Sequence, residues 1–286
     1  MSHSANSGHG RRSRFLTCRR LNRLAAAFVL CAFQWAVGTS GLEAAEMTAE
    51  EVSALLAAAT RDAPPDLSSR DLSGLDLSGL DFKAGNLRGA DLTGAKLLRA
   101  NLQGAELHRA KLVGADLSEA ILDLAILRGA DLSGAKLRGV SAFSTVLAET
   151  DLRRADLSDA RLVCNLERAD LTGANLSGAE MSADMKNQPM GLMRVSLRKA
   201  KLANANLGGA DLSRGLLEFA DFTGANLTGA NLMRAEAAGA DFSGADLSGA
   251  IFRKTDVQDA RFRNIRGREK IIDIDTAQNL ETAVFD

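Results

Sequence analysis

The 286-residue chain has few of the side chains from which most enzyme sites are built. It contains no Tyr, three His and three Cys, and of these only His108 and Cys164 lie beyond the first 31 residues. A protein metal site takes three or four ligands, and a Ser-His-Asp triad needs its His beside a cleft. We therefore expect no catalytic activity, no metal and no cofactor.

Cysteine and proline are both too scarce to stabilise the fold through disulfides or rigid turns. Beyond the N-terminal segment Cys164 has no second cysteine with which to form a disulfide. It stands two residues before Leu166, a place relative to Leu at which this chain most often carries Ala, so we expect a small, buried side chain. Two of the three prolines, Pro64 and Pro65, stand together and are expected to follow the end of a short helix.

Long hydrophobic runs are also absent, apart from Leu24 to Val37. That run is shorter than the roughly 20 residues of a membrane-spanning helix, it follows six arginines, and small residues continue to Ala45. Residues 1–45 are therefore predicted to be a secretory signal peptide, with an uncleaved N-terminal anchor as the alternative. Either would place the protein in the periplasm or cell envelope, and only an anchor would bring it into contact with the membrane.

No strong excess of one charge remains once the leader is removed. The chain's 35 basic residues fall to 29 and its 36 acidic residues to 35, because the leader carries six Arg and Glu43. Such a mild negative charge predicts solubility and no general affinity for nucleic acid.

The chain does contain one five-residue pattern, exemplified by Ala90-Asp91-Leu92-Thr93-Gly94, which recurs from Leu67 to Phe262. In an α-helix, leucines five residues apart would be spread over every side, and in a flat strand they would alternate between the two faces. They share one interior only if the chain bends once per repeat while it climbs. The spacing therefore predicts a β-solenoid.

Within a repeat, Leu and the Ala two residues before it point inward. Asp or Asn before Leu, and Ser, Thr or Arg after it, are then expected to point outward. Gly often occupies the last position, where a corner can require a positive φ.

The pattern Ala-Asp/Asn-Leu-Xaa-Gly resembles the pentapeptide-repeat proteins, and the resemblance covers roughly residues 66–264. It implies an all-β fold, a right-handed, quadrilateral, parallel β-helix with four repeats, or twenty residues, in each coil. The repeats would then make about ten coils and a rod of about 45 to 48 Å.

Short segments at both ends are predicted to cap the solenoid. Residues 46–65 are expected to form a capping helix and linker, because Thr48 and Glu51 make a capping box and Val52, Leu55 and Leu56 share one helical face. Residues 265–286 are expected to form a C-terminal cap, with Ile272 and Ile274 in a last strand and residues 276–282 in a helical turn. Caps are needed because the end of a solenoid exposes core and strand edge.

The repeat is interrupted twice. Leu162 and Leu166 are four residues apart instead of five, and Met181 and Leu192 are eleven apart instead of ten. The second interruption, residues 182–191, has lost its inward Leu and is predicted to be a protruding loop. Its polar residues, Lys186, Asn187 and Gln188, are candidates for contact with a partner.

Residues twenty apart should stack about 4.8 Å from one another on the surface. A column of alternating sign would contain Lys96, Asp116, Lys136 and Asp156, and Arg99 would stack with Glu119. A column of cations would contain Arg194, Arg214, Arg234 and Lys254, and a shorter basic column would contain Arg88, His108 and Arg128. Because stacked like charges are unfavourable, we hypothesise that the longer basic column binds an anionic partner.

The sequence as a whole favours a non-catalytic, exported scaffold or protein-interaction rod. Its partner would be an unidentified protein or an anionic polymer of the envelope. The family suggests an alternative, because some pentapeptide-repeat proteins resemble a DNA duplex in shape and charge and bind DNA gyrase. The basic columns and the leader disfavour that alternative here.

Overall fold

The computed structural model describes residues 47–60, 62–82, 84–183 and 193–286. The predicted leader, residues 1–45, and the candidate contact residues Lys186, Asn187 and Gln188 lie outside them. The chain divides into Met1–Glu43 and Ala44–Asp286, and the second unit contains all of the repeats. No helix in the part of the chain that the structure describes is long and apolar enough to cross a membrane.

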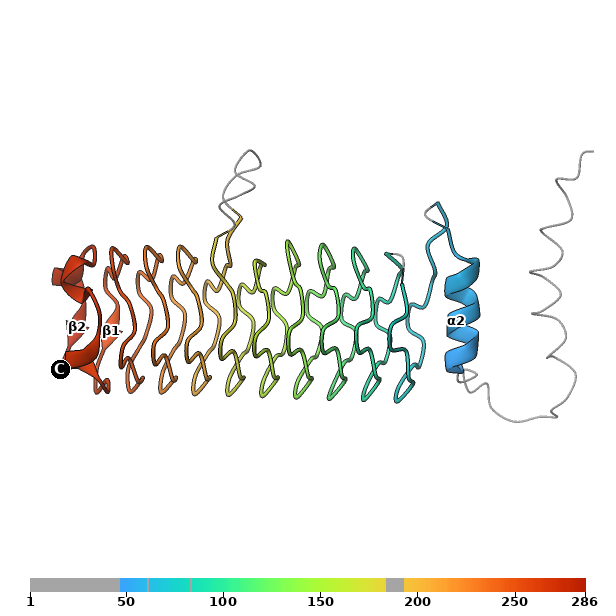
Figure 1. Cartoon of the computed structure of the whole chain (residues 1–286), viewed down its shortest axis with the longest axis horizontal. Coiled ribbons are helices and arrows are strands. Elements are labelled where there is room, and N and C mark those ends of the chain that lie inside the picture. Colours follow the sequence, from blue (N-terminus) through green and yellow to red (C-terminus); the bar gives the residue numbers. More distant parts are fainter. Residues whose placement is uncertain (1–46, 61, 83, 184–192) are drawn as a thin grey trace, which may run out of the picture. The chain divides into compact units, whose positions relative to one another are not determined.

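The repeats form a parallel β-solenoid, with successive coils stacked side by side (Figure 1). Each side of a coil contributes one bridging residue, which pairs in parallel with the residue twenty positions further along. Consecutive pairs around one coil are Asn86 with Glu106, Asp91 with Lys111, Lys96 with Asp116 and Asn101 with Ile121. Backbone hydrogen bonds such as that from Leu92 N to Lys111 O, 2.7 Å, tie each coil to the next. The twenty-residue coil with four sides is therefore present as the resemblance implied.

The interior is a single column of Leu, Phe and Ala side chains. The repeat centres, from Leu67 to Phe262, are no more than 2% exposed wherever the structure describes them, and the small residues two positions earlier are also buried in most coils. Toward the C-terminus Phe replaces several leucines, and the rings of Phe222, Phe242, Phe262 and Phe285 stack with centroids 4.9 to 5.1 Å apart. The inward direction of Leu and Ala, predicted from the period alone, is confirmed.

A local hydrogen bond to the side chain of the residue before Leu shapes many of the corners. The side chain of Asp91 accepts a hydrogen bond from the backbone N of Thr93 at 3.1 Å, which turns the chain out of the bridge. The next residue has a positive φ, 66° at Gly94, and the chain then enters the following side. Arg, Glu, Asp, Leu and even Phe occupy this left-handed position in other repeats, as in Leu124 with φ 63° and Phe219 with φ 59°.

The missing residue between Leu162 and Leu166 shortens one corner. Val163 and Cys164 fill that corner and are both buried, and the pairing interval falls to nineteen residues, as between Val146 and Asn165. Burial raises the pKa of the Cys164 thiol to about 12, so the thiol stays protonated. Cys164 is a packed core residue, as the sequence predicted.

The N-terminal helix α2, Ala49–Ala58, begins at the predicted capping box. Thr48 Oγ1 accepts from Glu51 N at 3.3 Å, and Glu51 Oε2 accepts from Thr48 N at 3.0 Å. Val52 and Leu56 are buried in the same core cluster as the leucines of the solenoid. The helix thus provides apolar cover for the solenoid core.

The C-terminal segment differs from the predicted strand and helical turn. Only Ile272 of the pair Ile272 and Ile274 bridges, to Ile251, because the segment follows a period of six residues rather than five. Its corners are single turns of 3-10 helix, η2 at Arg268–Lys270, η3 at Ile274–Thr276 and η4 at Leu280–Thr282. Strand β2, Val284–Phe285, then pairs in parallel with β1, Arg261–Phe262.

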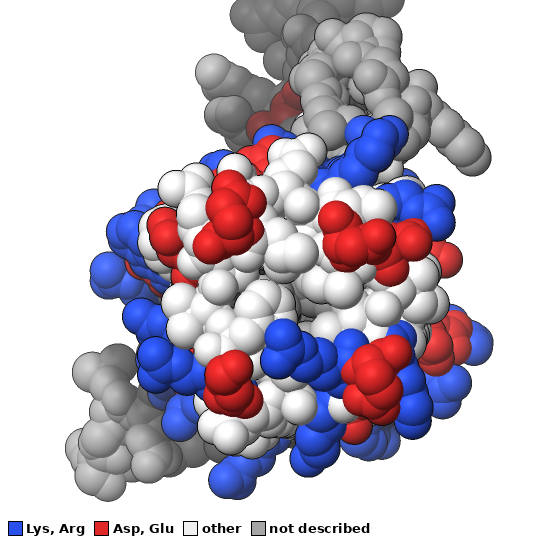
Figure 2. Space-filling model, turned by 90° about the vertical axis from the view of Figure 1, so that its left-hand side faces the viewer, with Lys and Arg blue, Asp and Glu red and all other residues white. Residues whose placement is uncertain are grey.

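The end of this last coil carries charges of both signs around its rim (Figure 2). Residues other than Lys, Arg, Asp and Glu occupy the centre of that view. Among the residues packed against the core here are Ile271, Ile274, Leu280 and Phe285, which are only partly buried.

Candidate binding surfaces

Equivalent corners of successive coils stack into edges that run along the solenoid. We call "irregular edge" the one formed by the corners that follow Leu122, Ala142, Leu162, Met181, Leu212, Leu232 and Phe252. Both interruptions of the repeat fall on it: the shortened corner at Val163–Cys164, and the inserted residues between Met181 and Leu197. The two interruptions of the five-residue repeat therefore lie at the same corner of consecutive coils.

The predicted basic column lies on the irregular edge. Arg214, Arg234 and Lys254 occupy its left-handed corner position, with φ of 60°, 57° and 55°. Arg214 is half-buried and the other two are exposed. Within the described residues their side chains have no ion-pair partner, so three uncompensated cations follow one another along this edge.

Arg194 does not belong to that uncompensated set. Its Nη1 lies 2.6 Å from Glu236 Oε1, and its side chain is only 26% exposed. The prediction of four equivalent stacked cations was wrong in this respect, because Arg194 follows the insertion and lies just before Val195, outside a regular corner. Its charge is neutralised by Glu236.

Further along the same edge is a group of exposed apolar side chains. Leu124 is 55% exposed and Ile121 is 41% exposed. In the next coil the Phe143 ring lies 5.3 Å from the guanidinium of Arg161, and Phe143 N donates to Asp123 Oδ1 at 2.8 Å. Phe143 therefore points outward, while the undersized centre Ala142 is fully buried.

The predicted column of Lys96, Asp116, Lys136 and Asp156 is present on a flat side, and the predicted stack of Arg99 with Glu119 is present at a corner. The ion pairs are Lys96 with Asp76 at 3.5 Å, Lys136 with Asp116 at 3.5 Å and Arg99 with Glu119 at 2.7 Å. All have side chains that are about a third to two thirds exposed, so each contributes little to stability.

An amide ladder continues the first of these columns and was not predicted. Asn175 donates to Asp156 at 2.9 Å, Asn206 to Asn175 at 3.0 Å and Asn226 to Asn206 at 2.8 Å. The sequence signal was present, since these asparagines occupy the position before the central Leu in consecutive coils.

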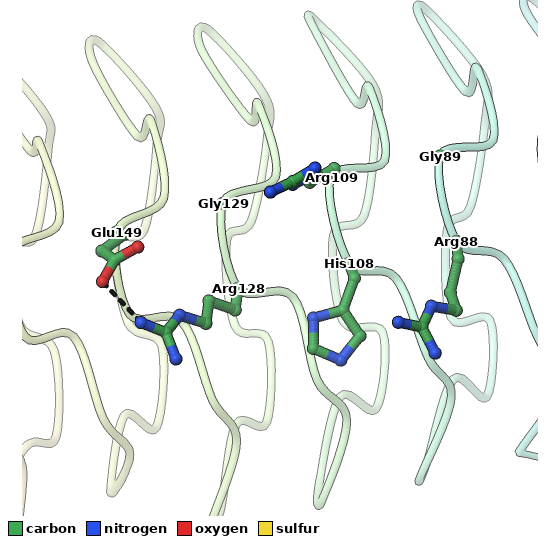
Figure 3. A pocket seen from close by; sticks show the side chains of 7 residues that line it. All are labelled: Arg88, Gly89, His108, Arg109, Arg128, Gly129 and Glu149. Atoms are coloured by element: carbon green, nitrogen blue, oxygen red, sulfur yellow. Dashed lines mark hydrogen bonds and ion pairs between the residues drawn. The ribbon is translucent and has the colours of Figure 1, made fainter.

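A basic hollow lies on a second edge, formed by the corners that follow Leu87, Leu107, Leu127, Leu147 and Leu166, which we call the "His108 edge". The residues that line it are Arg88, Gly89, His108, Arg109, Arg128, Gly129 and Glu149, and they enclose about 510 Å³ (Figure 3). The sequence had identified Arg88, His108 and Arg128 as a short basic column. It had missed Arg109, whose signal is that it replaces the corner Gly found in the coils before and after it, at Gly89 and Gly129.

Only part of the positive charge in this hollow is compensated. Arg128 Nη2 lies 2.7 Å from Glu149 Oε1, and this hydrogen bond with its charge attraction lowers the pKa of Glu149 and raises that of Arg128. Arg88 Nη1 lies 3.3 Å from Glu106 Oε2, and both side chains are largely exposed. Within the described residues His108 and Arg109 make no side-chain hydrogen bond or ion pair.

The described residues offer no group of three or more His, Cys, Asp or Glu side chains that could hold a metal ion. Their surfaces are corners, flat sides and shallow hollows, so the geometry suits contact with another molecule. The class of protein that this fold defines is a repeat solenoid.

The comparisons with known proteins identify the family. A model of pentapeptide repeats matches eight copies, over residues 66–97, 100–139, 164–183, 192–229 and 230–266. The chain belongs to the pentapeptide-repeat family, whose members fold as right-handed β-helices. No curated protein sequence matches the chain.

Two solved structures illustrate the similarity. HetL, a pentapeptide repeat protein involved in heterocyst differentiation regulation from the cyanobacterium Nostoc sp. strain PCC 7120, is 29% identical in sequence. That match covers 84% of this chain and 97% of HetL, with a TM-score of 0.66. QnrB1, a plasmid-mediated fluoroquinolone resistance protein, is 20% identical over 74% of this chain and 90% of its own, with a TM-score of 0.41.

Proposed function

We propose that the protein is a non-catalytic, exported scaffold of about ten coils, capped at both ends, whose irregular edge binds a partner protein. The observation that carries the proposal is the gathering of both repeat interruptions and of Arg214, Arg234 and Lys254 on one edge. A scaffold without a partner has no need for such an asymmetry, since any corner could accept an insertion.

The charge of that edge indicates the chemistry of the partner. Three cations without ion-pair partners among the described residues repel one another at the spacing of adjacent coils, about 4.8 Å. Carboxylates on a partner would relieve that repulsion and form charge-assisted hydrogen bonds. The proposed partner is therefore a protein with an acidic surface, and an anionic envelope polymer is the other outcome of the test.

Affinity capture tests the edge directly. The bait is the wild-type chain or a triple variant with Arg214→Gly, Arg234→Gly and Lys254→Gly. Gly is the residue that many repeats carry at this corner, so the variant should fold. We expect the wild type to retain a partner that the variant loses.

A matched control uses three corner cations from the other edges, Arg154→Gly, Arg168→Gly and Lys199→Gly. These residues also have positive φ values, of 59°, 58° and 57°, and make no ion pair within the described part of the chain. Equal loss of the partner in both triple variants would refute a specific edge. Recovery of the native protein from the cytosol with Met1 intact would refute export.

A second candidate, a DNA mimic that binds DNA gyrase, draws support from one stripe of carboxylates. Asp131, Asp151 and Asp170 stack in consecutive coils. Basic side chains offset two of them, since Lys201 Nζ lies 3.4 Å from Asp170 and Arg153 Nε lies 2.8 and 2.9 Å from the two carboxylate oxygens of Asp151. Inhibition of gyrase supercoiling by the purified protein would favour this candidate over the scaffold.

A further inference from the structure

The hollow on the His108 edge exists because two of its corner residues are glycines, which have no side chain to fill it. Gly89 and Gly129 occupy its corner positions with φ of 64° and 67°, whereas the corner between them carries Arg109 with φ 54°. A Cβ on Gly129 would lie 3.7 Å from Arg109 Cγ, so the Arg109 side chain extends across that bare corner. Because neither Gly89 nor Gly129 has a side chain, the Arg109 side chain covers the Gly129 corner, and the Gly89 corner has no side chain of its own.

Donors from three successive coils line this space. Arg88, His108 and Arg128 come from equivalent positions about 4.8 Å apart, and Arg109 lies beside His108 (Figure 3). Two carboxylates, Glu106 and Glu149, compensate Arg88 and Arg128. The guanidinium of Arg109 and the imidazole of His108 have no side-chain partner in the part of the chain that the structure describes.

The compensated arginines can also contribute to binding. The side chains of Arg88 and Arg128 are 57% and 58% exposed, and those of their partners Glu106 and Glu149 are 44% and 43% exposed. Ion pairs this exposed are weak and exchange readily with solvent or another anion. An incoming anion can therefore contact Arg88 and Arg128 without first breaking a strong interaction.

We propose that this hollow binds a phosphate group, as a free ion or as the monoester of a small molecule. The acceptor sites of a carboxylate lie in one plane, whereas the oxygens of a tetrahedral phosphate accept hydrogen bonds from several directions. The volume of about 510 Å³ lies within the range of small-molecule sites and has room for the group that carries the phosphate. This site goes beyond the proposed scaffold function and lies on a different edge from it.

The test follows the His108 imidazole by NMR in the full chain, with His108→Gln identifying its resonances. Inorganic phosphate, phosphoserine and succinate are titrated separately at constant ionic strength. We expect a saturable shift with the two phosphate compounds and a much weaker response to succinate. A tighter complex with phosphoserine would indicate a monoester, and equal affinities would indicate that the phosphate group alone is recognised.

Arg109→Gly is the diagnostic variant. It installs the residue found at Gly89 and Gly129, so the fold should be kept, and it removes a charge-assisted donor. We expect phosphate affinity to fall about tenfold or more. Arg168→Gly, an exposed corner Arg on the same edge but outside the hollow, should leave the affinity unchanged.

Three results would overturn the proposal: no saturable shift with either phosphate compound, an equal response to succinate, or unchanged affinity in Arg109→Gly. The triple Gly variant of the irregular edge separates the two proposals. If it loses the partner but still binds phosphate, the two sites are independent. If it keeps the partner, the proposed function fails, and if Arg109→Gly keeps its phosphate affinity, the phosphate site fails.

Discussion

The Asp that precedes Leu in many repeats is a turn-forming residue as well as a surface charge. Asp91 accepts from Thr93 N at 3.1 Å and pairs with Lys111 at 3.2 Å. The first interaction is local and fixes the corner, whereas the second joins exposed ends of side chains. We therefore attribute most of the structural contribution of Asp91 to its hydrogen bond with the backbone.

Asp91→Ala is expected to lower the free energy of unfolding by about 1 kcal/mol, the usual net value of one hydrogen bond. Asp91→Asn keeps an acceptor oxygen for Thr93 N and loses only the exposed ion pair, so it should cost much less. Urea unfolding of the two variants checks this difference. Equal destabilisation would assign the effect to the charge.

The same hydrogen bonds predict sensitivity to acid. The side-chain and backbone groups of Ser73 and Ser248 lower the pKa of Asp71 and Asp246 in the folded state. Stability from such carboxyls is fully present above the unfolded-state pKa of Asp, about 4, and is lost as the pH falls through the lower folded-state values. Urea midpoints should be constant near neutral pH and fall below about pH 4, and a midpoint unchanged in acid would contradict this account.

For single residues, the sequence predicted whether a side chain points inward or outward but not its hydrogen-bond partner. A five-residue period determines that Leu92 and Ala90 point inward, because geometry alone decides it. It also placed Asp91 outside, correctly. It did not identify the bond to Thr93 N, because an outward direction says nothing about which backbone group lies within reach.

Among the elements of the solenoid, the corners are where backbone strain arises, because most have a residue with a positive φ. Gly94 has φ 66° and open space around the position of a Cβ, so Gly94→Ala should cost only the left-handed penalty, about 1 to 2 kcal/mol. Gly239 has φ 67°, but a Cβ there would lie 2.6 Å from the ring of Phe219 in the previous coil. Gly239→Ala should therefore be the more destabilising change in thermal melts.

A double variant checks this explanation. Phe219→Gly removes the ring, which is 62% exposed, and should reduce the cost of Gly239→Ala to that of Gly94→Ala. Additive effects of the two substitutions would exclude a contact between Phe219 and the added methyl group.

In the C-terminal coil, the prediction based on a five-residue period was wrong. Ile272-Asp273-Ile274-Asp275-Thr276-Ala277 and Gln278-Asn279-Leu280-Glu281-Thr282-Ala283 are two copies of a six-residue repeat. The sixth residue lets each corner close as a 3-10 turn after a left-handed residue, Asp273 or Asn279. A search for spacing five cannot find this, although the paired Asp/Asn and Thr-Ala positions were a visible signal.

For the molecule as a whole, the spacing predicts which residues stack in columns but not which of their charges are neutralised or where hollows form. The twenty-residue coil correctly grouped Arg214, Arg234 and Lys254, and also Arg88, His108 and Arg128. It could not show that Arg194 is neutralised by Glu236, because the insertion moves Arg194 out of the regular corner geometry. Nor could spacing alone reveal the hollow beside Arg109, which depends on which side chains are missing from neighbouring corners.

The closed N-terminal end leads to a prediction about association. Val52 and Leu56 of α2 are buried in the solenoid core cluster, at 0% and 4% exposure. Replacing both with Lys would bury two charges without partners, which costs more than the packing of one short helix can offset. The helix should detach and leave apolar core and unpaired strand edge open to other chains.

We therefore expect Val52→Lys with Leu56→Lys to associate in a concentration-dependent manner, measured by light scattering during size-exclusion chromatography. Ala54→Lys with Ala58→Lys adds the same charges to the exposed side of α2 and should elute like the wild type. Because the remaining coils keep their own hydrogen bonds, circular dichroism of the first variant should lose only the helical signal. Unchanged elution together with that loss would mean that the first coil needs no cover, whereas loss of the β signal would mean that α2 is required for the solenoid to fold.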